Sequence, residues 1–169
     1  MRLLWAKSDF LHPTTRGGQI RTLEILKRLH KQHEVHYVAL HRPGETEGIE
    51  RSSEYCTRAY PIAHDVPDHY SPAFAAQLVR GLFSPLPVAI FRYRSAAMRT
   101  KLTELATRVR FDGVVCDFLA PSANFERLDQ AVLFQHNVET ALWQRHAEHA
   151  GSPAKRAYLA LQANRMFAF

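Results

Sequence analysis

Cysteine and long apolar runs are scarce in this sequence of 169 residues, and both absences narrow the class of protein. The two cysteines, Cys56 and Cys116, lie far apart and form no CxxC pair, so neither a disulfide framework nor a zinc site is predicted. No apolar run is long enough to cross a bilayer, and Lys7, Asp9 and His12 interrupt the apolar start too early for a signal peptide. These features favour a protein of the reducing cytoplasm.

Glycine is also sparse, and the glycine-rich nucleotide motifs are missing. Neither GxGxxG nor the P-loop pattern occurs, and the metalloprotease pattern HExxH does not occur either. His146 and His149 with Glu148 form a histidine cluster that is typical of a solvated helix face, so no metal is predicted. A dinucleotide oxidoreductase domain is our weakest interpretation, because His41 and Arg42 stand where an acidic residue would bind the ribose.

Acidic residues are outnumbered, 16 against 22 basic ones, which gives a formal net charge of +6. That charge predicts attraction to an acidic partner, such as anionic lipid, a phosphorylated substrate or nucleic acid. Lysine and arginine are spread over several expected helices, whereas nucleic-acid binding favours a concentrated basic stripe. We therefore expect no nucleic-acid partner.

What the sequence does contain is an alternation of short apolar strands and amphipathic helices, typical of one α/β domain over residues 1–169. The spacing predicts strands at 2–6, 35–40, 57–62, 111–117 and 130–135. It predicts helices at 19–31, 71–83, 95–110, 138–149 and 153–169, and an exposed loop at 41–53. The first strand, helix and strand form a βαβ unit, so we expect a three-layer Rossmann-like parallel sheet with helices on both faces.

Three stretches follow the expected strands at their carboxyl ends, where open parallel sheets bind ligands. The first, residues 7–18, ends in Gly17 and Gly18 directly before a helix. Glycines in this position let backbone amides approach a phosphate, and Arg16 and Arg21 flank the turn. A tight turn without a ligand explains the glycine pair equally well.

The other two stretches carry polar residues after the fourth and fifth expected strands. Asp117 stands ahead of Pro121 and fits either a ligand contact or a turn cap. His136 follows the fifth strand with Asn137 and Glu139 beside it, where an imidazole is able to hydrogen-bond a sugar hydroxyl or act as a base. A capping histidine fits the same position equally well.

The sequence closes on an apolar helix whose final residues include Met166, Phe167 and Phe169, with no glycine or polar tail to end it. We expect that the chain is a fragment truncated before a further domain, or that this apolar end docks on something outside the sequence. The aromatic segment 83–93, with Arg92 and Arg94 beside it, predicts either core packing or an apolar and basic acceptor groove.

Three stretches, FLHPTTRGGQIRT, FDGVVCDF and LFQHNVET, together resemble the N-terminal domain of glycosyltransferase family 4 proteins, which adopt the GT-B fold. The resemblance spans the whole chain and is strongest in the glycine loop and in QHNVE. It implies one half of an enzyme in which two Rossmann-like domains face each other across a cleft. In that arrangement Gly17, Gly18 and Arg21 bind the donor diphosphate, and His136 is the catalytic residue that contacts the transferred sugar.

The same resemblance implies further contacts and partners. Asp117, Asn137, Glu139 and Arg16 are candidates for contacts with the acceptor or the sugar. Family members retain anomeric configuration without a metal or a resident cofactor, since the nucleotide-diphosphate sugar is a substrate whose leaving phosphate helps to deprotonate the acceptor. The sequence lacks the donor domain with its Glu-x7-Glu motif, so we expect a half-enzyme of the hexosyltransferase type that needs a C-terminal GT-B domain in cis or in trans.

Two hypotheses of different classes follow. In the first, the chain is the acceptor-side domain of a retaining glycosyltransferase of polysaccharide biosynthesis, cytoplasmic or peripheral at the inner membrane face. Its acceptor is a glycan or a lipid-linked sugar, and the domain is inactive alone. In the second, the chain is a non-catalytic basic α/β module that docks an anionic membrane surface or a protein partner.

Overall fold

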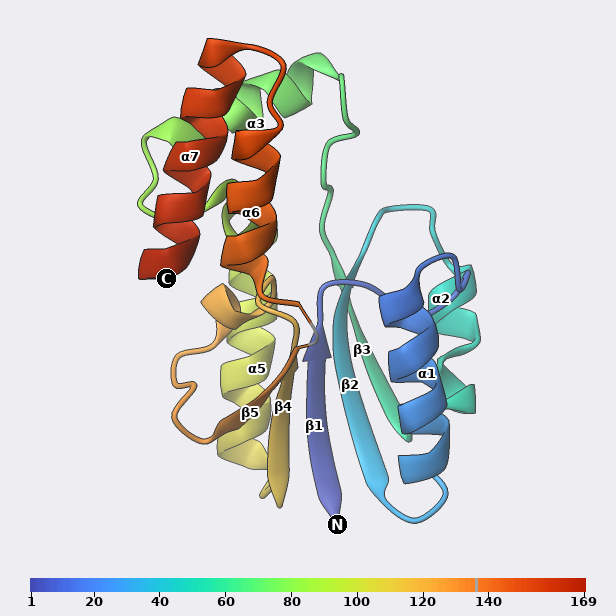
Figure 1. Cartoon of the computed structure of the whole chain (residues 1–169). Coiled ribbons are helices and arrows are strands. Elements are labelled where there is room, and N and C mark those ends of the chain that lie inside the picture. The colour runs from blue at the N-terminus through green and yellow to red at the C-terminus, as the bar shows by residue number, and fades with distance from the viewer. Residues whose placement is uncertain (136) are drawn as a thin grey trace. The chain divides into compact units, whose positions relative to one another are not determined.

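The computed structural model describes residues 1–135 and 137–169, which form two compact units (Figure 1). The first unit comprises Met1–Val66 and Tyr93–Phe134, and the second comprises Pro67–Arg92 and Gln135–Phe169. Each unit is therefore assembled from two separate stretches of chain. The first contains the sheet, and the second is built from helices.

In the described residues the sheet of the first unit has five strands, every neighbouring pair parallel, in the order β3-β2-β1-β4-β5. The strands are β1 (Arg2–Lys7), β2 (Glu34–His41), β3 (Arg58–Ala63), β4 (Gly113–Asp117) and β5 (Ala131–Phe134). All five strands were expected from the apolar runs, and the α/β fold with a Rossmann-like parallel sheet is confirmed. The carboxyl ends of parallel strands lie at one edge of such a sheet, so the loops that follow them gather there.

Helices cover both faces of this sheet, which makes three layers. Helix α1 (Gly17–Leu29) packs on one face, and α5 (Ala96–Arg108) packs on the other. Successive side chains of β1 alternate between the two cores: Trp5 belongs to the core under α1, while Leu4 and Ala6 belong to the core under α5. Both faces of β1 are buried, which explains why its sequence is a nearly continuous apolar run.

The described residues of the second unit form α3 (Pro72–Leu82), α4 (Val88–Phe91), α6 (Glu139–Glu148) and α7 (Pro153–Ala168). Helices α6 and α7 lie side by side as a hairpin (Figure 1). Ser71 and Ser152 are the N-cap residues of α3 and α7, because each hydroxyl accepts a hydrogen bond from an amide of the first turn. Inside the unit, the buried Gln162 of α7 accepts a hydrogen bond of 2.7 Å from the amide of Val88 in α4.

The exposed loop predicted at 41–53 is wrong in part, because α2 (Glu47–Glu50) and the 3-10 helix η1 (Ser52–Glu54) fold there. Close packing explains the difference. A Cβ added to Gly48 would lie 2.5 Å from Phe10 Cβ and 2.8 Å from the carbonyl oxygen of His12. Only glycine lets α2 approach the loop after β1 so closely. The polar sequence of 41–53 gives no indication of this contact.

Helix α1 also begins two residues before the expected position, at Gly17. Gln19 supplies the start signal, since its Oε1 accepts hydrogen bonds of 3.1 Å from the amides of Thr15 and Arg16. A side-chain acceptor at this point satisfies backbone amides that no helical carbonyl can reach. Gly17 and Gly18 therefore belong to the first turn of the helix.

Candidate functional site

The strand order reverses between β1 and β4, so the switch point of the sheet lies at the carboxyl ends of these two strands. The strands are paired directly, with Ala6 opposite Cys116. Residues 8–16 form the loop that leaves β1 for α1, and Phe118 is the first residue after β4. Open parallel sheets bind their ligands at such a reversal, which makes this edge the candidate site.

An ion pair joins the last residues of β1 and β4. Lys7 Nζ lies 3.2 Å from Asp117 Oδ2, and the two side chains are 2% and 0% exposed. Removing one partner of such a pair leaves an uncompensated charge in the protein interior. Asp117, a predicted contact of the acceptor or the sugar, thus lies beneath the surface and links two strands; its direct contact with a ligand stays a prediction.

Two neutral donors complete the environment of Asp117. Trp5 Nε1 donates a hydrogen bond of 2.9 Å, and Thr22 Oγ1 donates one of 2.8 Å, both to Oδ2. Because Thr22 belongs to α1, this carboxylate also fixes the helix to the sheet. The second oxygen, Oδ1, is buried and accepts no hydrogen bond from the residues that the structure describes.

Phe118 covers this pair from the end of β4. The Lys7 ammonium lies 4.1 Å from the centroid of the Phe118 ring, within the range of a cation–π contact. Phe118 has a φ of 68°, in the left-handed region that a residue with a Cβ rarely adopts. Such strained residues concentrate at functional sites, and here the left-handed turn leads the chain away from β4 beside Lys7.

Asp9 lies two residues beyond β1 and remains partly exposed. Its Oδ2 accepts a hydrogen bond of 2.8 Å from Gln19 Nε2, and the same amide group caps α1 through Oε1, so its orientation is fixed. Burial raises the pKa of Asp9, while the charges of Lys7 and Arg16 act in the opposite direction. A carboxyl with a raised pKa at a switch point is a candidate functional group.

The first half of the 8–16 loop is held in place by neighbouring elements. Tyr37 of β2 donates a hydrogen bond of 2.8 Å to the carbonyl oxygen of Asp9, and Phe10 and Leu11 are buried in the core under α1. The partly exposed or exposed residues 13–16 follow. The loop therefore presents Asp9 from an ordered base.

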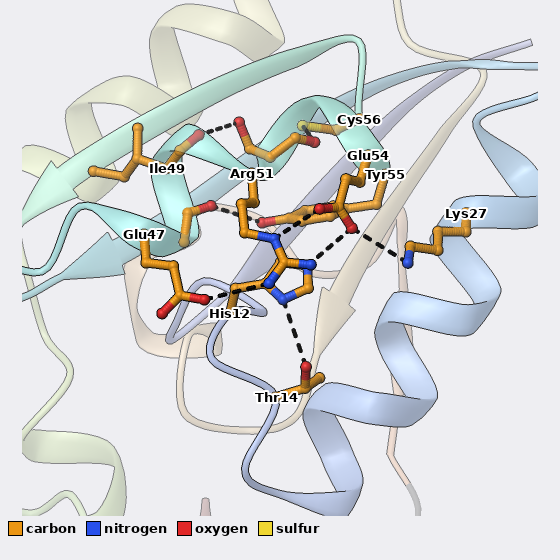
Figure 2. A network of polar contacts seen from close by, with 11 residues as sticks. His12, Thr14, Lys27, Glu47, Ile49, Arg51, Glu54, Tyr55 and Cys56 are labelled. Atoms are coloured by element: carbon orange, nitrogen blue, oxygen red, sulfur yellow. Dashed lines mark hydrogen bonds and ion pairs between the residues drawn. The ribbon is translucent and has the colours of Figure 1, made fainter.

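His12 anchors the middle of the same loop in a polar network (Figure 2). Its Nε2 lies 3.2 Å from Glu54 Oε2, which lies 3.3 Å from Lys27 Nζ of α1. Arg51 Nε donates a hydrogen bond of 2.7 Å to Glu54 Oε1, and this bond is the main reason that the pKa of Glu54 falls to about 2. Helix α1, the loop and η1 are thereby connected through one carboxylate.

The predicted phosphate-binding residues lie around the first turns of α1. Arg16, Gly17 and Arg21 are exposed, and a Cβ added to Gly17 would meet nothing within 4 Å. The Arg21 guanidinium lies 4.5 Å from the centroid of the Phe134 ring at the end of β5. The structure thus brings Arg16, Gly17, Gly18 and Arg21 to the switch-point edge, on the same helix start that Gln19 caps.

Three further predicted residues follow β5. His136 lies outside the described residues. Asn137 is exposed, and Glu139 is the first residue of α6, where partial burial raises its pKa. Both belong to the second unit. In the described part of the chain no group of three or more His, Cys, Asp and Glu side chains is arranged to hold a metal ion.

Lys7, Asp9, Gln19 and Thr22 were not proposed as site residues from the sequence. The parallel pairing of β1 with β4 offers a signal for Lys7. A lysine closing β1 and an aspartate closing β4 must meet if those strands are neighbours, and buried charges need partners. Asp9 and Gln19 give a weaker signal, because their ten-residue separation becomes a contact only through the path of the loop.

Comparisons of this chain with protein-family models, curated proteins and solved structures find no match. The class of protein therefore follows from its own fold and site: a Rossmann-like α/β unit with a polar switch point. Within the described residues, no helix is long and apolar enough to cross a membrane.

The switch point combines a buried base with a polar rim. The base is the Lys7–Asp117 pair, which is electrically balanced and closed to solvent. The rim consists of Asp9, Gln19, Arg16 and Gly17, and we use the name switch-point rim for these four residues. A carboxylate accepts hydrogen bonds from hydroxyl groups, whereas a guanidinium and the start of a helix attract phosphate. The rim thus suits a ligand that carries both hydroxyl and phosphate groups.

Proposed function

We propose that this chain is the acceptor-side domain of a retaining glycosyltransferase. The reaction transfers a sugar from a nucleotide-sugar donor to a hydroxyl group of a glycan or a lipid-linked acceptor. The observation that carries the proposal is the switch-point rim, in which an oriented carboxylate, Asp9, lies at the start of a helix that also exposes Arg16 and Gly17. The resemblance of FLHPTTRGGQIRT and QHNVE to the motifs of glycosyltransferase family 4 supports the same proposal.

In this proposal the residues have three roles. Gly17, Gly18 and Arg21 lie against the donor diphosphate, where the amides of the first helical turn and the guanidinium oppose its charge. Asp9 accepts a hydrogen bond from the acceptor hydroxyl and orients its oxygen toward the sugar. His136, with Asn137 and Glu139 nearby in sequence, contacts the transferred sugar.

The chemistry requires no nucleophile from this chain. The bond between the anomeric carbon and the diphosphate oxygen breaks, the bond to the acceptor oxygen forms, and the acceptor proton passes to the leaving phosphate. The chain contributes position and charge, which account for much of the acceleration of group-transfer reactions. No metal or resident cofactor is part of this scheme.

A single Rossmann-like sheet supplies only one wall of such a site. We propose that the second wall, which selects the nucleotide, comes from a C-terminal GT-B domain in cis or in trans, and that closure of both walls excludes water. We assign the reaction to the cytoplasmic side, at the inner membrane face when the acceptor is lipid-linked.

Nuclear magnetic resonance titration of the chain tests this proposal directly. Amide spectra are recorded with UDP-glucose, GDP-mannose and inorganic pyrophosphate. We expect weak, millimolar binding with shifts concentrated in residues 9–21, because the donor-selecting wall is absent. Gly17→Ala is expected to reduce these shifts, since its methyl group enters open space in the free protein but the path of a phosphate in the complex.

Gly151→Ala is the matched control, because an added Cβ there also meets nothing within 4 Å and the residue lies in the second unit. It should leave the titration unchanged. Tight donor binding by the chain alone would contradict the assignment to the acceptor side. Absence of any shift in residues 9–21 with all three probes would contradict the phosphate-binding role of the glycine turn.

A further inference from the structure

Helix α3 of the second unit exposes an apolar face. Val79, Leu82 and Phe83 are 56%, 43% and 87% exposed, and Phe83 is the residue that ends the helix. Their spacing of three and four residues places them on one side of the helix. Exposed Ala75 and Ala76 extend that side toward the start of α3. Contiguous large apolar side chains at this exposure mark a surface that meets a partner.

This face is exposed although the opposite side of α3 is firmly attached. Gln77 Oε1 accepts a hydrogen bond of 3.0 Å from Arg92 Nε, and the Arg92 guanidinium lies 4.9 Å from the centroid of the Phe74 ring. Arg165 of α7 donates hydrogen bonds of 2.8 and 2.7 Å to the carbonyl oxygens of Gly81 and Leu82. The last turn of α3 is therefore capped by a side chain, and Phe83 is held outward at its end.

Basic residues predominate around this face, although the same unit also exposes Asp68 before α3 and Glu148 on α6. The sequence has no Asp or Glu between Asp68 and Glu104, and none after Glu148. Arg80 is exposed on α3, and Lys155 and Arg156 are exposed on α7, the helix that touches the end of α3 through Arg165. An apolar surface whose charged neighbours are mainly cationic is complementary to an anionic surface.

The aromatic residues narrow the choice of partner. Tyr70 is fully exposed just before α3, and Phe83 ends it. The Tyr70 side chain is an apolar ring with a polar hydroxyl group, which is typical of the boundary between lipid and water. Basic side chains at that boundary bind lipid phosphates. No helix in the described residues could span a bilayer, so the fitting geometry is a helix lying in the plane of the interface.

We propose that α3 docks on an anionic lipid bilayer, with Val79, Leu82 and Phe83 inserted among the lipid head groups and Arg80 paired with lipid phosphate. Lys155 and Arg156 strengthen the attraction over longer range. This surface is separate from the switch-point rim and does not depend on the glycosyltransferase assignment. It gives the chain a lipid surface as a partner whatever its reaction.

Co-sedimentation with lipid vesicles tests the proposal. Binding is measured on vesicles of phosphatidylcholine alone and of phosphatidylcholine mixed with phosphatidylglycerol. We expect binding to the anionic vesicles that weakens at high salt, because surface charges are screened. Phe83→Ser should lower the partition coefficient about tenfold, since it removes one of the inserted aromatic side chains.

Ile20→Ser is the matched control, because Ile20 is 52% exposed on α1 of the first unit and should not contact the bilayer. Both substitutions replace an exposed apolar residue, so circular dichroism should show a folded chain in each case. Arg80→Glu should weaken binding to anionic vesicles more than it weakens the residual binding to neutral ones. Gly17→Ala should leave vesicle binding unchanged, which separates this proposal from the proposed donor site.

A site-specific probe adds a direct measurement of insertion. Cys56 and Cys116 are buried, and burial raises the pKa of each thiol to about 12, so a thiol introduced by Phe83→Cys reacts selectively with an environment-sensitive fluorophore. Its emission should shift to the blue on anionic vesicles. Vesicle binding unaffected by Phe83→Ser, or no binding at all, would overturn the proposal. A dimer of the chain that Phe83→Ser converts to monomers would equally overturn it and assign this face to a second copy.

Discussion

Asp117 and Glu54 are two carboxylates of the first unit that each gather several donors in very different surroundings. Asp117 is fully buried. Its Oδ2 accepts hydrogen bonds from Trp5 and Thr22 and forms an ion pair with Lys7. The Glu54 carboxylate accepts a hydrogen bond from Arg51 and lies close to the side chains of Lys27 and His12, but it is 32% exposed. Asp117 holds two strands and a helix together, whereas Glu54 connects a loop, a helix and η1.

The difference teaches that burial, and not the number of partners, decides what a polar network contributes. Water competes for the partners of Glu54, and salt screens its charges, so much of its Coulomb attraction is lost. Water does not reach the buried donors around Asp117, so removing the Asp117 carboxylate leaves these donors without an acceptor. The rigid part of the candidate site is therefore expected beneath the rim.

Asp117→Ala should have the largest effect on stability. Lys7 would remain buried without its partner, which costs about 3–5 kcal/mol of unfolding free energy. Urea unfolding followed by circular dichroism measures the loss. Lys7→Met combined with Asp117→Leu should recover part of it, because the charge is gone while Trp5 and Thr22 still lack an acceptor. A loss no larger than that of a Glu54 variant would remove the contrast between the two networks.

Gly48→Ala should have the next largest effect, about 1–3 kcal/mol, since its methyl group would collide with Phe10 Cβ and the carbonyl oxygen of His12. Gly17→Ala is the matched control in open space, and it should leave stability unchanged or raise it by about 0.4–1 kcal/mol. Urea midpoints of the two variants give the comparison. Equal midpoints would mean that α2 and the 8–16 loop separate without cost.

Asp9→Asn should stabilise the chain at neutral pH. Burial raises the pKa of Asp9, so the folded state binds a proton more tightly than the unfolded state does. Stability from this group is thus highest in acid and falls as the pH rises from the ordinary value of 3.8 through the folded pKa. The variant should lose this pH dependence, and its urea midpoint should exceed that of the wild type only above the same window.

Asp129→Asn provides a control of opposite sign, because the hydrogen bond from Arg127 lowers the pKa of Asp129. It should reduce stability at neutral pH and leave it unchanged in strong acid. If Asp9→Asn also weakens the nucleotide-sugar titration, then a group that costs stability is retained for binding. Unchanged stability at all pH values would contradict the raised pKa of Asp9.

The sequence was sufficient for the strands and the two long helices of the first unit, and insufficient for α2, for η1 and for the contacts between elements. Apolar runs such as 111–117 mark buried strands, because both faces of a parallel sheet must be covered. Helix α1 begins two residues before the position that the spacing predicts, since its signal is the side chain of Gln19 and not the glycine pair. Local patterns determine strands and helices, whereas caps depend on the conformation of the loop.

The candidate site was predictable in place but not in composition. Ligands of open parallel sheets bind at the carboxyl ends of the strands, which locates the edge, and Gly17, Arg16 and Arg21 lie there. The roles of Lys7 and Asp9 depend on which strands are neighbours and on how the 8–16 loop folds, and neither follows from spacing. The helix at 71–83 is likewise predicted by the sequence, but the pattern does not reveal that Phe83 stays exposed.

Glu54→Gln should have the smallest effect. The hydrogen bond from Arg51 lowers the pKa of Glu54 from 4.5 to about 2, so this group stabilises the fold above pH 4.5 and its contribution disappears as the pH falls toward 2. The difference between wild type and variant should therefore be small at neutral pH, absent in strong acid, and reduced further by salt. Urea midpoints at low and high ionic strength measure it. A loss that equals that of Asp117→Ala and resists salt would show that the His12 network is as closed to water as the Lys7–Asp117 pair, and the 8–16 loop would then be fixed from its surface as firmly as from its base.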